Sequence, residues 1–421
     1  MDKRFIKSAD ETLYTYTHSS GAKIYMVQKK GSSKSAAYFT THFGSIDNCF
    51  IPFGETEYIC VPDGVAHFLE HKMFEMPDKS NIFDMFSKYG ASANAYTSFN
   101  MTSYYFWCTD FFKENLKTLV TFVQTPHFTE ENVAKEQGII GQEIRMYDDA
   151  PTWRCYFNML SCMYEKNPVS RDIAGTVESI SEIDKDVLYK CYNTFYHPSN
   201  MTLCLVGDFD PEDMKNYLDE ILKPLPNEDE IKRKSETDGA AVICREKCAE
   251  MSVSRPIYTI GFKDNFCSGN ILKRRVAVQI ALNLLIGKSS DLYNDLYESG
   301  HISPEFGFDY TGEETYAFTE IADECDNPSY VADKIKTAIQ NFKVSDDDFE
   351  RIRRKLFGKS LYVFNDPDNY AGALARNTVL GLDLYETLDL FKTVTRADVE
   401  DVFKTHLTED NMVISIVNPL H

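Results

Sequence analysis

Two histidines and a glutamate lie close together in the segment His67-Phe68-Leu69-Glu70-His71. Residues four apart in a helix share one face, about one turn from each other, so both imidazoles can reach a single metal ion. Glu70 lies next to His71 near that face, where its carboxylate can take a proton from an attacking water molecule. The segment therefore predicts a zinc (Zn2+) site with His67 and His71 as ligands and Glu70 as general base.

A catalytic zinc site also needs a third protein ligand and an open coordination position. Candidates lie downstream, where a helix with acidic residues in its first turn is expected over 129–147. Glu136 and Glu143 are seven residues apart on this helix, nearly two turns, so both carboxylates share a face and could address one site. The plainer alternatives are a surface helix that carries two histidines by chance, and a second helix with a solvated acidic face.

Hydrophobic periodicity indicates the elements that must position these residues. Residues 23–27 and 35–42 alternate or run apolar, which predicts strands. The Pro-Asp-Gly sequence at 62–64 predicts the start of the helix that carries the two histidines, because apolar residues recur behind it at helical spacing. The stretch 93–108 is rich in Tyr, Phe and Thr and predicts a pair of strands, and 111–124 predicts a further helix.

The two halves of the chain are weakly similar to each other. Residues 186–203 and 398–414 each run from an Asp-Val pair to an apolar strand, at an offset of 212 at one end and 211 at the other. The helix starts at 129–133 and 345–349 match at an offset of 216. At that offset hydrophobic and basic residues replace the two glutamates, so only the first half can hold the metal.

This duplication predicts the fold class and the domain boundaries. We expect an α+β protein with two homologous domains, each a mostly antiparallel sheet packed with helices. The first domain is expected at 1–225 and carries the zinc site, and the second, without metal, at 241–421. The charged stretch 226–240 between them is typical of a solvated linker.

Several segments together resemble the pitrilysin and insulinase superfamily, in particular its mitochondrial processing peptidase-like branch. The matching segments are 64–71, with the His-x-x-Glu-His order of the inverzincins, 90–97, 136–143 and 200–208. The resemblance runs over essentially the whole chain and is closest in the first half. It implies a zinc metalloendopeptidase whose two domains face each other across a peptide-binding chamber.

The resemblance also implies roles for individual residues. Glu143 corresponds to the third zinc ligand, and Glu136 corresponds to a supporting residue. Asn94, Ala95 and Tyr96 correspond to an edge strand beside the metal, to which an extended peptide adds as a further strand. An exposed edge offers unpaired N–H and C=O groups that suit this role, whereas composition alone fits an interior strand equally well.

The second half departs from the family pattern in one place. Family members usually carry there an arginine and a tyrosine that hold the substrate carbonyl. Residues 289–296 match the lead-in, but Tyr297 stands where the arginine is expected, and 300–306 offers no tyrosine at the corresponding place. In bipartite family members another subunit supplies this pair. We therefore expect a heterodimer with a homologous subunit, and a homodimer is the alternative.

Composition narrows the class of protein further. The 44 Lys+Arg and 65 Asp+Glu give a net charge of −21, which opposes binding to nucleic acid or to an anionic membrane. The N-terminal residues contain no signal-like apolar stretch, and no apolar run is long enough to span a bilayer. Eleven scattered cysteines in a chain of this size predict reduced thiols and a cytoplasmic location.

These observations predict the catalytic subunit of a zinc-dependent endopeptidase that hydrolyses short or unfolded peptides. One alternative is a non-catalytic structural subunit of a larger assembly. Another is a module that binds peptide or zinc without cleavage. The joint presence of His67, Glu70, His71 and Glu143 favours catalysis, because subunits that lose activity usually lose such residues.

Overall fold

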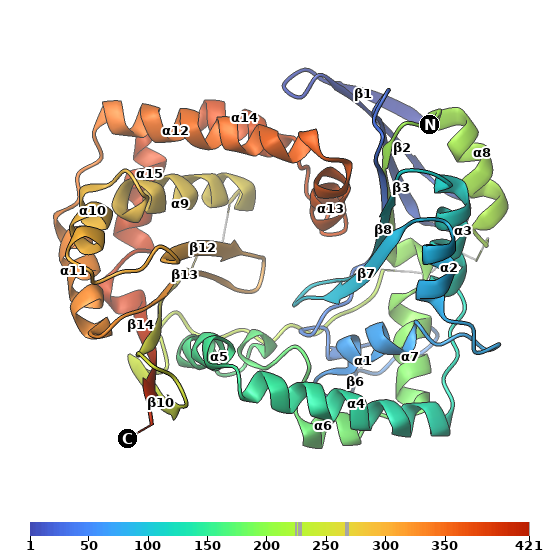
Figure 1. Ribbon diagram of the computed structural model, residues 1–421, viewed down its shortest axis with the longest axis horizontal. Helices are drawn as coiled ribbons and strands as arrows, with labels where there is room; N and C mark the ends of the chain where they lie inside the picture. Colours follow the sequence, from blue (N-terminus) through green and yellow to red (C-terminus); the bar gives the residue numbers. More distant parts are fainter. Residues whose placement is uncertain (224, 226–229, 266–268, 421) are drawn as a thin grey trace. The chain divides into compact units, whose positions relative to one another are not determined.

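The computed structural model describes residues 1–223, 225, 230–265 and 269–420. They form two compact units, each assembled from segments that are separate in the sequence (Figure 1). Unit 1 contains Met1–Ile144, Asp172–Lys234 and Leu361–Tyr385, and unit 2 contains Arg145–Arg171, Ser235–Ser360 and Glu386–His421. Each unit has its own sheet and its own helices, so the expected α+β class with two sheet-containing parts is confirmed.

Unit 1 is built on a seven-stranded sheet within the described residues, in which β9 pairs parallel to β3 and the other neighbours pair antiparallel. The central strand β9 is buried along its whole length, as expected where helices cover both faces of a sheet. In spatial order the strands are β1 (Asp2–Ile6), β2 (Glu11–Thr17), β3 (Lys23–Gln28), β9 (Met201–Gly207), β4 (Ser35–Thr41), β8 (Thr102–Cys108) and β7 (Ser92–Thr97).

Most helices of unit 1 cover one face of this sheet (Figure 1). The apolar residues of α3 recur at helical spacing and are buried, which fixes its orientation. Also in this unit are a small sheet of β5 (Cys49–Phe50) and β6 (Ile59–Cys60), and the short helix η2 (Pro198–Asn200). The helices of unit 1 that precede α13 are α1 (Val65–Lys72), α2 (Ile82–Lys88), α3 (Phe112–Val123), α4 (Glu130–Asp148), α6 (Val177–Ser181), α7 (Lys185–Phe195) and α8 (Pro211–Ile221).

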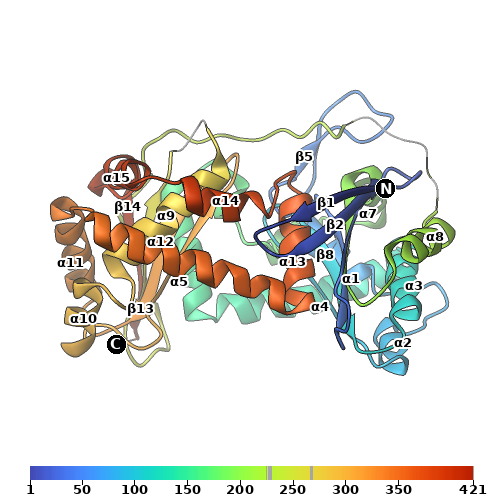
Figure 2. The ribbon, with the colours of Figure 1, turned by 90° about the horizontal axis from the view of Figure 1, so that it is seen from above.

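Helix α13 (Pro367–Thr378) covers the opposite face of the unit 1 sheet, against β4 and β9 (Figures 1 and 2). Small residues let the helix approach the strands closely. A Cβ atom on Gly372 would lie 3.1 Å from the ring of Tyr38, and the neighbouring Ala371 and Ala375 are buried. The helix is followed by Tyr385, whose hydroxyl contacts that of Tyr370, and preceded by η3 (Tyr362–Asn365).

Unit 2 repeats this plan with a five-stranded sheet within the part of the chain that the structure describes. Strand β14 pairs parallel to β10 and antiparallel to β11, as β9 does with β3 and β4. The strands are, in spatial order, β10 (Glu246–Met251), β14 (Met412–Pro419), β11 (Ile257–Lys263), β13 (Ala317–Glu324) and β12 (Gly307–Gly312). The matching strand orders give the sequence duplication a structural counterpart.

Helix α5 covers one face of the unit 2 sheet, and α9 lies on the other face (Figure 1). A Cβ atom on Gly261 of β11 would collide with Met159 and Met163, so this glycine allows α5 to lie close to the strand. The helical elements of the unit are α5 (Pro151–Met163), η1 (Pro168–Ser170), α9 (Ile271–Ile286), α10 (Asp291–Glu298), α11 (Pro328–Asn341), α12 (Asp346–Leu361), α14 (Glu386–Thr393), α15 (Arg396–Thr405) and η4 (Glu409–Asn411).

Helices α5 and α13 are exchanged between the two halves of the sequence. Helix α5 begins at Pro151 and α13 at Pro367, and 367 − 151 is the offset of 216 found between the earlier helix starts. Each helix packs on the sheet formed mainly by the other half. The compact units therefore differ from the domains expected at 1–225 and 241–421. Within the expected linker 226–240, residues 226–229 lie outside the described residues.

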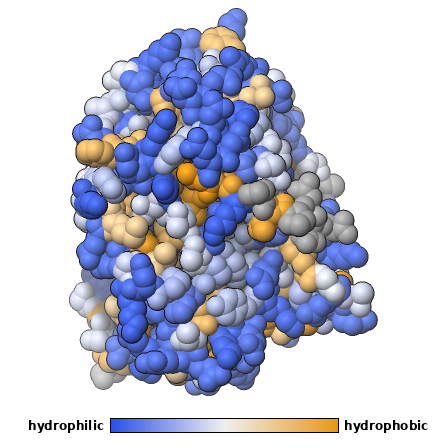
Figure 3. Space-filling model, turned by 90° about the vertical axis from the view of Figure 1, so that its right-hand side faces the viewer, coloured by the Kyte–Doolittle hydropathy of each residue, from blue (hydrophilic) through white to orange (hydrophobic). Residues whose placement is uncertain are grey.

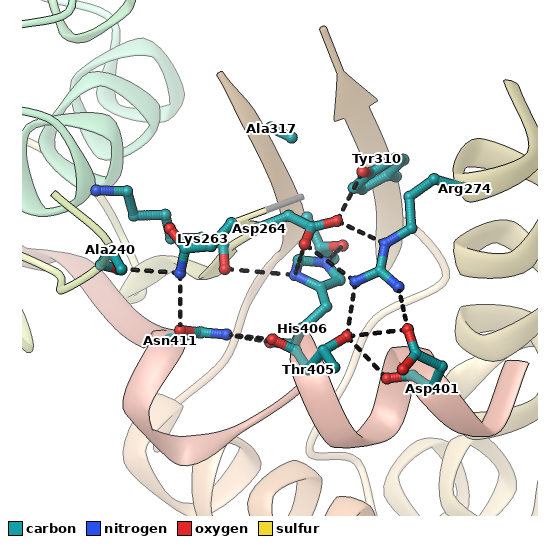
Figure 4. Close-up of polar contacts among 12 residues, drawn as sticks. Ala240, Lys263, Asp264, Arg274, Tyr310, Ala317, Asp401, Thr405, His406 and Asn411 are labelled. Atoms are coloured by element: carbon teal, nitrogen blue, oxygen red, sulfur yellow. Dashed lines mark hydrogen bonds and ion pairs between the residues drawn. The ribbon is translucent and has the colours of Figure 1, made fainter. Parts of the chain in front are cut away.

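A buried polar network joins strands to helices in unit 2 (Figure 4). Arg274 donates two hydrogen bonds of 3.0 Å to the carboxylate of Asp264, which also accepts one of 2.8 Å from the Tyr310 hydroxyl. His406 is fully buried beside them, with Nε2 2.8 Å from the Thr319 hydroxyl. Because the charges are paired and hydrogen-bonded, these contacts offset the desolvation penalty of burying the network.

Two disulfides differ from the sequence-based expectation. Cys49 is joined to Cys60, and Cys162 is joined to Cys244. The prediction of reduced thiols is therefore wrong for these four cysteines, whose pairing has no signature in their sequence spacing. Disulfides persist mainly in oxidising compartments, whereas the expected cytoplasmic location rested on reduced thiols. The location stays a prediction.

The polarity of the surface and the length of the helices can be compared with the remaining expectations from composition. On the face drawn in Figure 3 hydrophilic residues predominate, and hydrophobic residues form small separate areas. Among the described helices none combines the length and the apolar character that crossing a bilayer requires.

Candidate metal centre

Helix α1 is preceded by a position at which the local geometry requires glycine. Gly64, the residue before the helix, has φ of 92°, a left-handed conformation that favours glycine. A Cβ atom here would also lie 2.4 Å from the carbonyl oxygen of Ala174. Phe68 and Leu69 of the helix are fully buried, which leaves His67 and His71 on an adjoining face, one turn apart. The helix start predicted at 62–64 is confirmed.

His67, His71 and Glu143 meet at one point of unit 1. One potential ligand atom from each lies within 4.8 Å of the other two. His67 Nε2 is 3.7 Å from Glu143 Oε1, and His71 Nε2 is 3.4 Å from Glu143 Oε2. Ligands about 2.0–2.1 Å from a tetrahedral zinc ion are separated by roughly 3.3–3.4 Å, so these separations suit a shared ion. Two imidazoles and a carboxylate are also a ligand set that zinc accepts.

Glu136 lies behind His71 on the side away from Glu143. Its Oε1 is 3.1 Å from His71 Nδ1, and because a carboxylate only accepts, the proton lies on Nδ1. This tautomer leaves the Nε2 lone pair facing Glu143. The ammonium group of the fully buried Lys72 lies 3.7 Å from Glu136 Oε2 and 2.7 Å from Glu75. These ion pairs fix the position of the Glu136 carboxylate in turn.

The second ring nitrogen of His67 is in a different situation. Its Nδ1 is buried and has no hydrogen-bond partner among the described residues, whereas Nε2 points toward Glu143. The two histidine rings pack edge to face with centroids 4.6 Å apart. Each ring therefore presents Nε2 to the same small space, and this convergence is what a single bound metal ion requires.

Burial and neighbouring charges shift the pKa values of these groups. Burial lowers the pKa of His67 to about 4, and the nearby His71 acts in the same direction. Burial also disfavours the charged form of His71, but the hydrogen bond to Glu136 and the charge of Glu143 outweigh it and raise the pKa of His71. Burial raises the pKa of Glu70 above its usual range. A neutral imidazole can bind a metal, and a carboxyl with a raised pKa is better matched to proton transfer near neutral pH.

Glu70 is held by the neighbouring strand. Its Oε2 accepts a hydrogen bond of 2.6 Å from the hydroxyl of Thr97, the last residue of β7. The main-chain amide of Thr97 contributes a second hydrogen bond to the carboxylate. Helix α1 packs directly on β7, so Glu70, His67 and His71 are positioned by one helix and one strand.

Strand β7, which carries Asn94, Ala95 and Tyr96, is an edge strand of the unit 1 sheet. The structure thus places these residues beside helix α1. The N–H of Ala95 does not pair with β8 but donates a 2.8 Å hydrogen bond to the Asn94 side chain. This amide therefore lies on the outer edge. Tyr96 contacts Arg376 of α13 on the other face of the sheet.

Tyr297, the residue that departs from the family pattern, lies on α10 in unit 2. The residue is 46% exposed, and its ring stacks on Tyr293 with centroids 5.8 Å apart. A tyrosine side chain carries no positive charge. No cation therefore stands at the position in the helix where the family pattern has arginine.

Three residues at the site have no role in the sequence-based prediction. Thr97 ends the segment 90–97 that resembles the family, but its contact with Glu70 depends on strand geometry. Lys72 follows His71 directly, yet its complete burial has no sequence signal. Arg376 is 280 positions from Tyr96, and only the exchange of α13 brings it to this sheet.

Comparison with known proteins agrees with this geometry. A family model described as insulinase (peptidase family M16) matches residues 51–177, which include His67, His71 and Glu143. A second model, described as the peptidase M16 inactive domain, matches residues 182–356. The residues expected to bind the metal therefore all lie in the first match.

Similar proteins span the whole chain. The uncharacterized zinc protease YmfH of Bacillus subtilis is 43% identical over 416 residues, 97% of each chain. An M16-like peptidase from Alicyclobacillus acidocaldarius has a solved structure with a TM-score of 0.93 and 32% identity, covering 97% of this chain and 99% of that one. A protease from Helicobacter pylori shares the fold, with a TM-score of 0.80 at 17% identity over 97% and 99% of the two chains.

The fold and the matched relatives define the class of protein, that of peptidases of the M16 type. The chain belongs to the insulinase family, peptidase family M16, and the resemblance seen in the sequence is confirmed.

Proposed function

We propose that the chain is the catalytic subunit of a zinc-dependent endopeptidase that hydrolyses short or unfolded peptides. The observation that carries this proposal is the convergence of His67, His71 and Glu143 at one point, with Glu70 fixed beside them. The names of relatives such as the zinc protease YmfH support the same metal and the same class of reaction.

In the proposed reaction His67, His71 and Glu143 hold the metal, and Glu136 keeps His71 in the tautomer that can bind it. When bound, zinc supplies Lewis acidity, which polarises a carbonyl group and lowers the pKa of water. Glu70 takes a proton from the attacking water molecule and delivers it to the leaving amine, the general-base and general-acid roles that one carboxylate can perform in turn.

The peptide is proposed to bind as an added strand along β7, through the main chain of Asn94, Ala95 and Tyr96. The outward-facing N–H of Ala95 is the feature that supports this, because it can exchange its contact with Asn94 for a carbonyl of the substrate. Binding through main-chain groups requires an extended substrate, which fits short or unfolded peptides.

A homologous partner subunit is proposed to supply the arginine and tyrosine that this chain lacks. Tyr297 stands at the arginine position, and loss of one oxyanion donor costs about 10²–10³ in rate. The proposed enzyme is therefore a heterodimer, and a homodimer is the alternative.

The test is digestion of a peptide library by the zinc-loaded chain, alone and mixed with a homologous chain that lacks the His-x-x-Glu-His segment. Weak cleavage alone and strong cleavage with the partner are expected. Full activity of the chain alone would refute the need for a partner, and no cleavage in either sample would refute the peptidase proposal.

A non-catalytic structural or peptide-binding subunit is the second candidate. The match of residues 182–356 to a domain described as inactive, together with Tyr297, favours it. The variant Glu70→Gln discriminates between the two. A peptidase loses about 10²–10⁴ in rate without its general base, whereas a binding subunit retains its peptide affinity and has no cleavage to lose.

A further inference from the structure

Thr97 connects the strand β7 to the carboxylate of Glu70. Its hydroxyl lies 2.6 Å from Glu70 Oε2 and 3.4 Å from the hydroxyl of Thr102, the residue opposite it on β8. A separation of 2.6 Å lies in the range of strong hydrogen bonds from a hydroxyl to a carboxylate, and 3.4 Å is beyond a good O–H···O distance. The Thr97 hydroxyl therefore forms its main hydrogen bond with Glu70.

The surrounding hydrogen bonds fix the direction of this contact. The Thr102 hydroxyl donates its only proton to the carbonyl oxygen of Phe43, at 2.9 Å. It can therefore only accept from Thr97 and has no proton to offer in return. The single proton of Thr97 goes to the carboxylate, because an ionised acceptor forms the stronger bond.

The position of Thr97 is itself well determined. Thr102 is fully buried, and the Thr97–Thr102 pair closes the antiparallel ladder of β7 and β8. A threonine side chain has restricted χ1 rotation because it is branched at Cβ. The hydroxyl is thus presented to Glu70 from a fixed point, and holding Oε2 also sets the direction of the other carboxylate oxygen.

We propose that Thr97 is a positioning residue for the reaction, which holds Glu70 in the orientation needed for proton transfer. This rests on the proposed function. The same strand carries the residues 94–96 that are proposed to pair with the peptide. Thr97 therefore ties the base to the strand that sets the register of the scissile bond, so base and substrate keep a constant geometry.

The matched variants are Thr97→Val, which replaces the hydroxyl by a methyl group and keeps the branched shape, and Thr97→Ser, which keeps the hydroxyl. With the zinc-loaded chain and its partner, Thr97→Val is expected to lower kcat by about 10- to 100-fold with KM and zinc content unchanged. Thr97→Ser is expected to restore most of kcat. Thr40→Val is the control, because it removes a buried hydroxyl that bonds Ser103 of the same sheet, away from Glu70.

A wild-type kcat in Thr97→Val, or an equal loss in Thr97→Ser, would overturn the proposal. A second readout does not depend on activity: crystal structures of the zinc-loaded wild type and of Thr97→Val. Several Glu70 conformers, or a rotated carboxylate, are expected in the variant, and an unchanged single conformer would overturn the proposal. If Thr97→Val does not fold, Thr97→Ala takes its place. Absence of hydrolysis by the wild type refutes the peptidase function, and the crystal structures still decide the role of Thr97.

Discussion

The Nδ1 atom of His71 lies 3.1 Å from Oε1 of Glu136, and this contact directs the opposite nitrogen of the ring toward Glu143. A metal ligand held in this way does not need to reorient when the ion binds. The Glu136 carboxylate is in turn held by the buried Lys72. The orientation of the His71 ring therefore depends on contacts that begin in the interior of unit 1. The role proposed for Glu136 is therefore to orient His71 and not to bind the ion itself.

The variant Glu136→Gln is expected to weaken zinc binding by about 10- to 100-fold, because an amide holds the His71 tautomer less firmly than a carboxylate does. The measurement is competition with a chelator of known affinity. Glu131→Gln is the control, since this exposed glutamate lies on the same helix away from the ligands. Equal affinities in the two variants would show that the contact with His71 has no role in metal binding.

The variant Ala95→Pro removes the outward main-chain N–H of β7 and leaves the pairing with β8 in place. If a peptide adds to this edge, the loss of one hydrogen bond is expected to raise KM by about 3- to 10-fold with little change in kcat. Steady-state kinetics measure the two constants separately, and circular dichroism verifies the fold. An unchanged KM would count against peptide binding along this strand.

Thiol titration tests the two disulfides. Two disulfides among the described residues use four of the chain's eleven cysteines, so at most seven free thiols are expected in denaturant without reductant. After reduction the number is expected to rise to eleven. Eleven thiols in the protein as isolated from an intact cytoplasm would instead support the reduced state expected from the sequence.

The buried His406 makes the stability of unit 2 depend on pH. Burial lowers the pKa of His406 from 6.5 to about 4, and the charge of Arg274 acts in the same direction against that of Asp264. The unfolded chain therefore binds a proton at a higher pH than the folded chain does. The free energy of unfolding is expected to be fully maintained above pH 6.5 and to fall by about 3 kcal/mol as the pH drops toward 4.

Comparison with His406→Gln isolates this contribution, because other titrating groups are common to both proteins. Denaturant unfolding at pH 7 and pH 5 gives the difference. The variant is expected to be less stable at pH 7 but to lose less stability between the two pH values. Equal losses in both proteins would mean that His406 does not remain neutral in the folded state.

Local signals in the sequence predict the parts of the site that lie on single elements. The spacing of His67 and His71 on a helix and of Glu136 and Glu143 on another follows from helical periodicity, and α1 and α4 have close to the expected bounds. Both strands of the 93–108 pair are also confirmed as β7 and β8. The roles of the ligands remain proposals, although the structure brings the residues together.

Long-range packing explains what the sequence does not predict. The exchange of α5 and α13 depends on which sheet face each helix can cover, and the close approach at Gly372 and Gly261 is only recognisable once the partners are known. The pairing of Cys162 with Cys244 joins residues 82 positions apart. The contact of Thr97 with Glu70 likewise depends on how α1 packs on β7.

The central claim is that His67, His71 and Glu143 hold a zinc ion, and metal analysis of the purified chain after dialysis tests it most directly. One zinc ion per chain is expected for the wild type and almost none for His71→Gln, with both proteins folded by circular dichroism. A wild-type chain without stoichiometric zinc, or a His71→Gln chain that binds zinc equally well, would contradict the account.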